Sequence, residues 1–261
     1  MERVKAKKHL GQHFLKDLRI AESTAAALTG HMNTTHVVEV GPGMGVLTDF
    51  LLLKQDIFLT LIELDQESIR YLVQKYPKLE PQIRHEDFLK ANLQELQPHP
   101  LAIVGNFPYN ISSQLFFKAL ENRDCVTEVV GMLQKEVAQR LAAPKGSRTY
   151  GILSVLLQAF YVVEYLFEVP PEVFVPPPKV QSAVIRARRN GVQALDCDEK
   201  LFVRVVKQAF STRRKTLRNA LKPMGLSEEL KSDPQLDLRA EQLDVSEFIS
   251  LTNKIQASWN Q

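Results

Sequence analysis

Four consecutive residues, Asn106-Phe107-Pro108-Tyr109, combine the groups needed to hold an aromatic amine still. The Asn106 side chain supplies one carbonyl acceptor, and the Phe107 main-chain carbonyl supplies a second if Pro108 stiffens the turn. Tyr109 offers a ring face on which a base pulled out of its helix can stack. The exocyclic amine of adenine needs such help to react, because its lone pair is delocalised into the ring. The segment therefore predicts chemistry on such an amine; an Asn-initiated turn with a corner proline and a core tyrosine is the structural alternative.

A glycine-rich turn, Glu39 to Gly45, indicates a site for a nucleotide-like ligand. Gly41, Gly43 and Gly45 alternate with other residues, so the main chain can pass close to a ligand and open a helix whose first amides are unsatisfied. At the carboxyl edge of a parallel sheet, this is where open α/β folds bind nucleotides. A tight strand-to-helix connection without a ligand is the alternative.

Two carboxylates follow later strands and complete the expected cofactor site. Glu63 closes a strand, where an acid can accept hydrogen bonds from both ribose hydroxyls of an adenosine cofactor. Asp87 can accept from the adenine amino group while the Phe88 ring covers the base, although a solvated loop acid is the alternative. The spacing G-x-G-x-G after an acidic residue, with Val46 in place of the third glycine of a dinucleotide motif, favours S-adenosylmethionine over NAD.

Short apolar runs rich in β-branched residues place these motifs at the ends of strands. Segments of helical periodicity separate the runs, which indicates alternating strands and helices. Continuous hydrophobicity within each run is typical of a parallel sheet buried on both faces. We therefore expect an α/β fold with a doubly wound sheet, whose first strands are 36–40, 58–63, 82–86, 101–105 and 128–133.

The last third of the chain predicts a change of architecture. A buried run at 152–168 and an alternating strand at 182–188 are separated by a loop with five prolines, which cannot be helix interior. After Asn190-Gly191 the pattern becomes helical, with one helix expected over 199–221 and two shorter helices ending near Trp259. The expected domains are 1–190, with a basic arm at 1–19, and a small all-helical domain at 191–261.

The charge is distributed unevenly, although the formal net charge is only +3. The first nineteen residues carry six basic and two acidic side chains, and residues 186–222 carry eleven basic and three acidic ones. Basic segments on an otherwise acidic chain favour a polyanionic partner, because Lys and Arg that neutralise phosphates release counterions. Solvated helix faces are the alternative. On a helix, Arg214 and Arg218 would project from the same face.

Composition argues against several other classes of protein. A hydrophobic content of 44% excludes disorder as the main state. Cys125 and Cys197 cannot form a disulfide framework, and His9 and His13 have no third metal ligand nearby. No secretory signal is evident, and the longest apolar region, 151–169, is too interrupted to cross a bilayer. We expect a cytoplasmic protein that has no bound metal and no membrane segment.

Along nearly its whole length, the sequence resembles the S-adenosylmethionine-dependent ribosomal RNA adenine N6-dimethyltransferases. The likeness is greatest to the branch that dimethylates two adjacent adenosines near the 3′ end of small-subunit ribosomal RNA. The segments that carry the resemblance are Lys8 to Leu15, Glu39 to Gly45, Ile62 to Asp65, Asp87, Asn106 to Tyr109, Met132 to Glu136, Pro176 to Val180 and Arg213 to Thr216.

The resemblance implies a Rossmann-like class I methyltransferase sheet and further site residues. His13 and Leu15 would help cover the cofactor, and Phe174 would face the target base opposite Tyr109, with core packing as its alternative. His13 stands where many members have Asn, and Phe107 stands where Leu is more typical. The resemblance also implies that 1–190 is the S-adenosylmethionine-dependent methyltransferase domain and that 191–261 is an RNA-binding domain. The implied partner is small-subunit ribosomal RNA in an immature 30S particle, bound by a monomer through Lys7, Lys8, Lys179, Arg213, Arg214, Lys215 and Arg218.

The expected chemistry is direct attack of adenine N6 on the sulfonium methyl group, promoted by orientation and hydrogen-bond acceptance without a strong general base. Three alternatives stay open. They are a large-subunit methyltransferase of the macrolide-resistance type, a DNA adenine methyltransferase, and a non-catalytic assembly factor that keeps the fold. The segments 176–180 and 213–216 favour the small-subunit branch.

Overall fold

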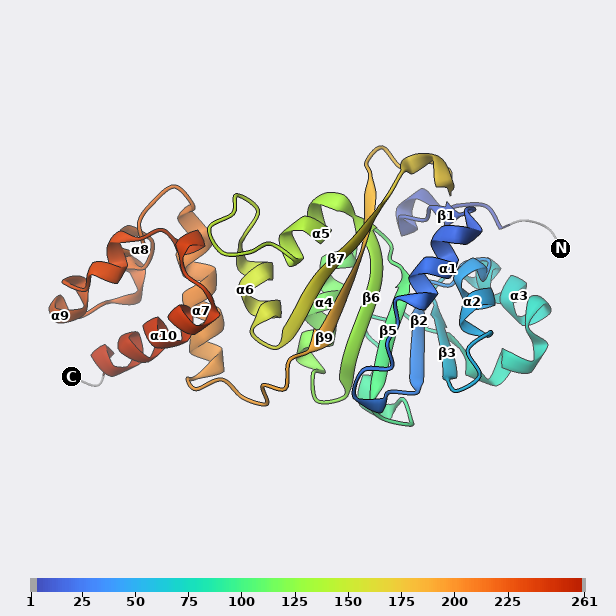
Figure 1. Ribbon diagram of the computed structural model, residues 1–261, viewed down its shortest axis with the longest axis horizontal. Coiled ribbons are helices and arrows are strands. Elements are labelled where there is room, and N and C mark those ends of the chain that lie inside the picture. The colour runs from blue at the N-terminus through green and yellow to red at the C-terminus, as the bar shows by residue number, and fades with distance from the viewer. Residues whose placement is uncertain (1–3, 260–261) are drawn as a thin grey trace. The chain divides into compact units, whose positions relative to one another are not determined.

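A seven-stranded sheet is the largest β-sheet of the computed structural model, which describes residues 4–259 (Figure 1). The strand order is β4-β3-β2-β5-β6-β9-β7. Two further short strands, β1 (Phe14–Leu15) and β8 (Phe174–Val175), pair with each other. The strands of the large sheet are β2 (His36–Val40), β3 (Phe58–Glu63), β4 (Ile83–His85), β5 (Leu101–Asn106), β6 (Val126–Gln134), β7 (Tyr161–Val169) and β9 (Ser182–Arg189).

The strand order of the sheet reverses between β2 and β5. β2 pairs in parallel with β3 on one side and with β5 on the other, and the sheet continues in parallel to β4 and β6. β9 then pairs antiparallel with β6. Because the connections after β2 and β5 leave in opposite directions, the carboxyl ends of these strands border a crevice, the usual ligand site of such sheets. The predicted doubly wound α/β architecture is confirmed.

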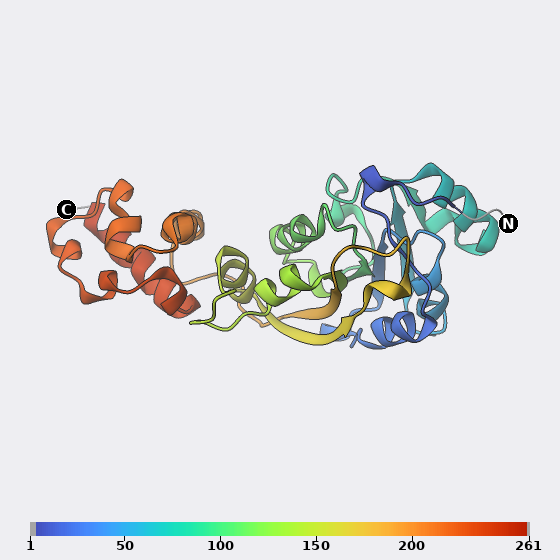
Figure 2. The same cartoon turned by 90° about the horizontal axis from the view of Figure 1, so that it is seen from above.

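Helices cover both faces of the sheet (Figures 1 and 2). Residues of α1 (Leu18–Ala26) and α2 (Val46–Leu51) share one core cluster with alternate residues of β2, β5 and β6. α4 (Ser112–Glu121) packs on β6. None of the helices within residues 4–259 is long and apolar enough to cross a membrane. The other helices are α3 (Gln66–Lys75), α5 (Lys135–Leu141), α6 (Ile152–Gln158), α7 (Glu199–Ala209), α8 (Leu217–Ala220), α9 (Glu228–Lys231) and α10 (Val245–Trp259).

The chain divides into two compact units, each described by itself below. The first unit contains residues up to Ala138 together with Val162–Arg189, and the second contains Gln139–Tyr161 together with residues from Asn190 onward. Gln139–Tyr161 groups with the C-terminal helices because α6 packs on α7 and α10. The division into separately folding domains at 1–190 and 191–261 stays a prediction.

The second unit corrects the expectation of one helix over 199–221. Helix α7 ends at Ala209, and α8 begins only at Leu217. Arg214 therefore lies outside an α-helix, whereas Arg218 lies in α8. The two residues do not share one helix face.

Long-range contacts hold the chain in the break between α7 and α8. The guanidinium of Arg213 donates hydrogen bonds to the main-chain carbonyls of Arg148 and Tyr150, more than sixty residues away. Thr216 pairs with Arg239 in an isolated antiparallel bridge. Local periodicity contains no information about these partners, which explains the error.

Candidate active site

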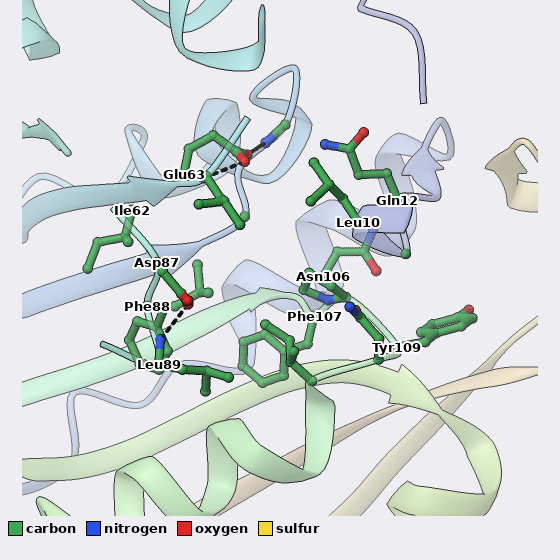
Figure 3. Close-up of a pocket in the computed structure, with 18 of the residues that line it drawn as sticks. Leu10, Gln12, Ile62, Glu63, Asp87, Phe88, Leu89, Asn106, Phe107 and Tyr109 are labelled. Carbon is green, nitrogen blue, oxygen red and sulfur yellow. Dashed lines mark hydrogen bonds between the residues drawn. The ribbon is translucent and has the colours of Figure 1, made fainter. Parts of the chain in front are cut away.

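A cavity of about 280 Å³ opens beside the carboxyl ends of β2, β3 and β5, where the strand order reverses (Figure 3). This volume is at the lower end of the usual range for ligand cavities, about 300–1,000 Å³. Motifs that are far apart in the sequence therefore meet at one place. The site residues predicted from the sequence that line this cavity are His13, Gly41, Gly43, Glu63, Asp87, Phe88, Asn106, Phe107, Pro108 and Tyr109.

A smaller cavity of about 40 Å³ adjoins the first. Gly41, Gly43 and Asn106 line both cavities, whereas Leu15 and Glu39 line only the smaller one. A ligand with a nucleoside and a shorter tail would use the two spaces together. Asn106 would then lie beside the point where the nucleoside and the tail of the ligand join.

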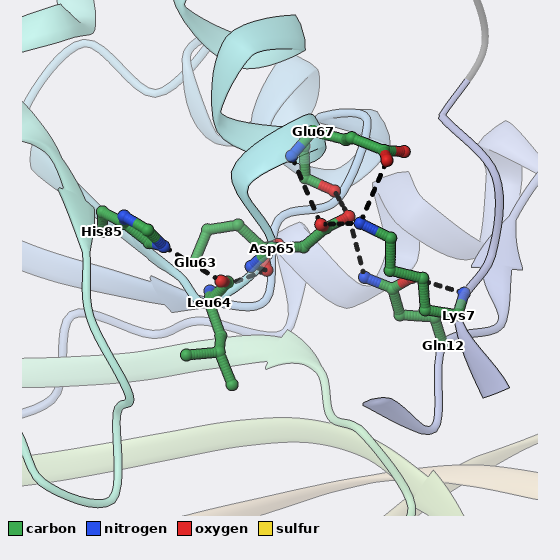
Figure 4. A network of polar contacts seen from close by, with 8 residues as sticks. Lys7, Gln12, Glu63, Leu64, Asp65, Glu67 and His85 are labelled. Atoms are coloured by element: carbon green, nitrogen blue, oxygen red, sulfur yellow. Dashed lines mark hydrogen bonds and ion pairs between the residues drawn. The ribbon is translucent and has the colours of Figure 1, made fainter. Parts of the chain in front are cut away.

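Glu63 connects the glycine-rich turn to the end of β3. Its side chain is buried, and one carboxylate oxygen accepts a hydrogen bond from the Gly43 N–H at 3.0 Å. The other oxygen accepts from the N–H groups of Leu64 and Asp65, both at 2.8 Å (Figure 4). Burial raises the pKa of the Glu63 carboxyl, and these hydrogen bonds oppose that effect. The result is a fixed acceptor on the cavity wall, suited to a ribose hydroxyl.

Gly45 has a packing role, and its predicted contact with a cofactor stays a prediction. It lines neither cavity, and its φ of +75° lies in the left-handed region that favours glycine. A Cβ atom at this position would come within 2.5 Å of the Tyr76 hydroxyl, which donates to the Gly45 carbonyl at 2.7 Å. Glycine is required here for the close approach of Tyr76.

Asp87 and Phe88 form the wall opposite the glycine-rich turn. One Asp87 carboxylate oxygen accepts a hydrogen bond from the Leu89 N–H at 3.0 Å. Phe88 is only 3% exposed but lines the cavity, so its ring forms part of an apolar wall. A carboxylate beside this apolar wall is suited to a base with an amino group at its edge.

The amide of Asn106 is oriented by the N-terminal arm. Its Nδ2 donates a hydrogen bond to the His13 main-chain carbonyl at 2.8 Å. This contact uses one of the two N–H donors of the amide and fixes its orientation, which leaves Oδ1 to accept from a ligand. This orientation fits the predicted role of Asn106 as an acceptor for a ligand, which stays a prediction.

The Phe107 ring fills a space created by two glycines in neighbouring strands. A Cβ atom at Gly131 would lie 2.2 Å from the ring, and one at Gly105 would lie 3.0 Å from it. Phe116 meets the ring edge-on at a centroid separation of 6.0 Å, and the Phe107 N–H donates to the Met132 carbonyl at 2.9 Å. The larger side chain at position 107 is thus accommodated behind the loop. The sequence analysis missed Gly131, which a glycine inside a strand could have signalled.

Tyr109 packs against His13. Their ring centroids are 5.2 Å apart with an interplanar angle of 30°, and the Tyr109 hydroxyl is hydrogen-bonded to that of Ser182. The His13 Nδ1–H donates to the Pro176 carbonyl at 2.7 Å, because a carbonyl oxygen can only accept. Burial raises the pKa of the Tyr109 hydroxyl. His13 therefore links the arm, the Asn106–Tyr109 loop and the proline-rich loop.

Phe174 lies in the core and lines neither cavity. It is 1% exposed and pairs with Leu15 between β8 and β1. Successive side chains of a strand point to opposite sides, so Val175, at 53% exposure, points outward instead. In this structure Phe174 therefore packs in the core, and its role facing a target base opposite Tyr109 stays a prediction.

Lys7 anchors the N-terminal arm to the start of α3 through ion pairs (Figure 4). The sequence predicts this residue to bind RNA. Its ammonium group pairs with Asp65 at 2.5 Å and with Glu67 at 3.3 Å, and hydrogen bonding to Asp65 raises the pKa of Lys7. Gln12 also donates to Asp65. The charge of Lys7 is therefore compensated inside the protein. Arg3, another basic residue of this arm, lies outside the described residues.

The other basic residues predicted to contact RNA divide into two groups. Arg218 pairs with Asp237 at 2.6 Å, and Arg213 is bonded to main-chain carbonyls. In contrast, the side chains of the remaining four are exposed and make no ion pair within the part of the chain that is described: Lys8, Lys179, Arg214 and Lys215.

Comparison with known proteins places these features in a family. A family model described as ribosomal RNA adenine dimethylase matches residues 3–257. A protein of Cytophaga hutchinsonii named ribosomal RNA small subunit methyltransferase A is 55% identical over 255 residues, which cover 98% of this chain and 99% of the relative. A protein of Flavobacterium johnsoniae with the same name is 56% identical over 258 residues, covering 98% of each chain.

Solved structures show the same fold. A dimethyladenosine transferase from Plasmodium falciparum matches with a TM-score of 0.75 at 23% identity, over 95% of this chain and 98% of the other. The 23S rRNA methyltransferase ErmE matches with a TM-score of 0.64 at 25% identity, over 93% of this chain and 99% of the other. The class I methyltransferase fold expected from the sequence is confirmed.

Proposed function

Because the chain belongs to the ribosomal RNA adenine dimethylase family, we propose that it dimethylates N6 of two adjacent adenosines near the 3′ end of small-subunit ribosomal RNA. The observation that carries this proposal is Asn106, whose amide donates to the arm and keeps its oxygen as an acceptor at the junction of the two cavities. Relatives at 55–56% identity are named for the small subunit, whereas ErmE, named for 23S rRNA, shares 25%. This difference favours the small-subunit reaction over the large-subunit alternative.

The protein uses S-adenosylmethionine, and the donors and acceptors of the site fit that cofactor. When bound, the cofactor supplies a methyl group on a positively charged sulfur. Glu63 would accept from the ribose hydroxyls and Asp87 from the adenine amine, against the apolar wall that includes Phe88. Gly41 and Leu15 border the smaller cavity, which suits the methionine end.

The Asn106–Tyr109 loop would hold the target base. Asn106 Oδ1 and the Phe107 carbonyl accept hydrogen bonds from N6, which favours positive charge developing on that nitrogen. The Tyr109 ring, fixed by Ser182 and His13, limits the motion of the base by stacking. These residues act by orientation and electrostatics, and no side chain is assigned as a strong base.

The proposed substrate is small-subunit ribosomal RNA in an immature 30S particle, bound by a monomer in the cytoplasm. Four of the residues that the family resemblance implies for RNA binding are exposed and make no ion pair among the described residues, so their charges can contact phosphates: Lys8, Lys179, Arg214 and Lys215.

Transfer of tritiated methyl groups to three substrates tests the proposal. Purified protein and labelled S-adenosylmethionine are incubated with small subunits from a strain that lacks this modification, with large subunits, and with duplex DNA. We expect incorporation only into the small subunits, recovered as N6,N6-dimethyladenosine after nucleoside analysis. Incorporation into large subunits or DNA would support one of the other enzymes, and absence of incorporation would support a binding factor without this activity.

A further inference from the structure

We propose that the solvent-facing side of helix α7, defined by Lys200, Arg204 and Lys207, is a binding surface for the phosphate backbone of RNA. These residues follow the spacing i, i+4 and i+7, and all three side chains are exposed. The opposite side of α7 is apolar and buried, with Leu201, Phe202, Val205, Val206 and Ala209 at 5% exposure or less. The inference rests on the proposed function, because it names a further part of the surface that would contact the RNA.

The three positive charges form a continuous line along the helix. Lys200 and Lys207 are two turns apart, about 10 Å along the axis at 1.5 Å per residue. One strand of a nucleic-acid duplex carries a charge about every 3.4 Å of axis. The line is therefore long enough to meet more than one phosphate.

These charges are not compensated within the protein. Among the residues that the structure describes, none of the three pairs with a carboxylate. The acidic residues at the start of α7 are occupied, because Asp198 accepts from the Leu201 N–H and Glu199 from the Leu195 N–H. Other cations of the same unit are paired: Lys145 with Asp244 and Glu247, Arg218 with Asp237, Lys231 with Glu228, and Lys254 with Asp233.

An aromatic ring lies beside this line of charge. The guanidinium of Arg204 is 5.9 Å from the ring centre of Trp259, which is 42% exposed. The Trp259 indole N–H donates to the Met224 carbonyl at 3.0 Å, which fixes the ring. Exposed aromatic rings interleaved with cations are suited to nucleic acid, because the cations meet phosphates and the ring can stack on a base.

RNA fits this surface better than a membrane does. A helix that binds an anionic bilayer inserts its apolar side among the lipids. In α7 that side is already buried in the unit, and the exposed side chains are those of Lys200, Arg204 and Lys207. A solvated helix face of the ordinary kind mixes acidic and basic residues, whereas every charged residue on this side is basic.

The salt dependence of RNA binding tests the inference. The variant Lys200→Gln/Lys207→Gln removes two unpaired charges, and Lys231→Gln/Lys254→Gln is the matched control, because it removes two paired charges from the same unit. Each full-length protein is titrated with small subunits lacking the modification at several salt concentrations. Because Trp259 is the single tryptophan of the chain, its fluorescence reports on binding at the proposed surface in a parallel titration with protein-free small-subunit RNA, which contains no tryptophan.

We expect the test variant to bind on the order of tenfold more weakly or worse at 0.1 M salt, and its log–log salt slope to fall by about 1.4–1.8, as for two lost phosphate contacts. The control should keep the wild-type slope. Equal slopes for the two variants, or equally tight wild-type binding to phosphatidylglycerol vesicles, would overturn the inference. Methyl transfer by the wild-type protein in the same preparation tests the proposed function separately, so failure of one is distinguishable from failure of the other.

Discussion

At the residue scale, the position of the active-site loop depends on two glycines that lie behind it and have no side chain. Phe107 brings a ring where family members more often have Leu, and the ring occupies the space next to Gly105 and Gly131. Because the Phe107 carbonyl is one of the two proposed acceptors for N6, this packing sets the position of an acceptor atom. Gly105 and Gly131 line neither cavity, but the space they leave for the ring helps to position the Phe107 carbonyl.

We predict that Gly131→Ala lowers kcat at least tenfold and that Phe107→Leu/Gly131→Ala recovers most of the loss. A new Cβ only 2.2 Å from the ring forces the loop to move, and overpacking of this kind costs about 1–3 kcal/mol. The smaller Leu relieves the clash. The test is to measure kcat and KM for methyl transfer, with Phe107→Leu alone as the control. Unchanged kcat in Gly131→Ala, or no recovery in the double variant, would contradict this role of the packing.

The buried carboxyl of Glu39 should make the folded protein less stable as the pH rises. Burial raises the pKa of this carboxyl from 4.5 to about 8. Between these values the unfolded chain has released the proton that the folded protein still holds, so rising pH favours unfolding, by up to about 1.4 kcal/mol per pH unit. Glu39→Gln cannot ionise and keeps an acceptor for the Thr48 hydroxyl, which donates to Glu39 at 2.6 Å.

The comparison is made by urea unfolding of both proteins at pH 5.5 and 7.5. We expect the free energy of unfolding of the wild type to fall, relative to the variant, by about 2–3 kcal/mol between the two pH values. A constant difference between the proteins at both pH values would show that Glu39 is already ionised in the folded state.

At the scale of elements, the N-terminal arm acts as a wall of the cofactor cavity. Leu10, Gln12 and Phe14 line the larger cavity. Lys7 holds the beginning of this segment to Asp65, and the pairing of β1 with β8 holds its end. The affinity for cofactor should therefore depend on an ion pair whose atoms lie outside the cavity.

We predict that Lys7→Met weakens binding of S-adenosylhomocysteine about three- to tenfold. Exposed ion pairs contribute up to about 1 kcal/mol, and the Asp65 side chain is almost completely buried, which leaves its charge poorly solvated when Lys7 is removed. Isothermal titration calorimetry measures the dissociation constant. Lys8→Met is the control, because Lys8 is exposed. Equal affinities for the two variants would mean that the ion pair does not hold the arm in place.

The elements differ in how far the sequence predicts them. Strands β2, β3 and β5 were predicted within a residue because continuous β-branched runs end at sharp breaks, and the motifs at their ends converge as expected. The break after α7 was missed because it is held by partners far along the chain. The burial of Phe174 follows from strand pairing with Leu15, which the local pattern around Phe174 does not contain. Local patterns predict elements, whereas distant contacts decide where they end and which side chains reach a cavity.

At the scale of the whole molecule, the cofactor contacts are assigned to the first unit alone, whereas the proposed RNA contacts are distributed over both units. Both cavities are lined by residues of the first unit, whereas α7 belongs to the second. The small net charge of +3 is the sum of basic segments and an acidic remainder, and some basic residues, such as Lys7, are neutralised internally.

We predict that the two kinds of binding are separable by mutation. Lys200→Gln/Lys207→Gln should keep the wild-type dissociation constant for S-adenosylhomocysteine within about twofold while weakening RNA binding, because no residue of α7 lines either cavity. Calorimetry with S-adenosylhomocysteine and RNA titration of the same preparation measure the two effects. Loss of cofactor affinity in this variant would indicate a general defect in folding.

The most direct test of the central claim is the formation of N6,N6-dimethyladenosine by Asn106→Ala. Wild-type and variant proteins, each with a native circular dichroism spectrum, are incubated with S-adenosylmethionine and small subunits lacking the modification, and nucleosides from the RNA are separated and quantified. We expect dimethyladenosine with the wild type and at least a hundredfold slower formation with the variant, because the side-chain acceptor for N6 is removed. Formation at a wild-type rate by Asn106→Ala would contradict that claim.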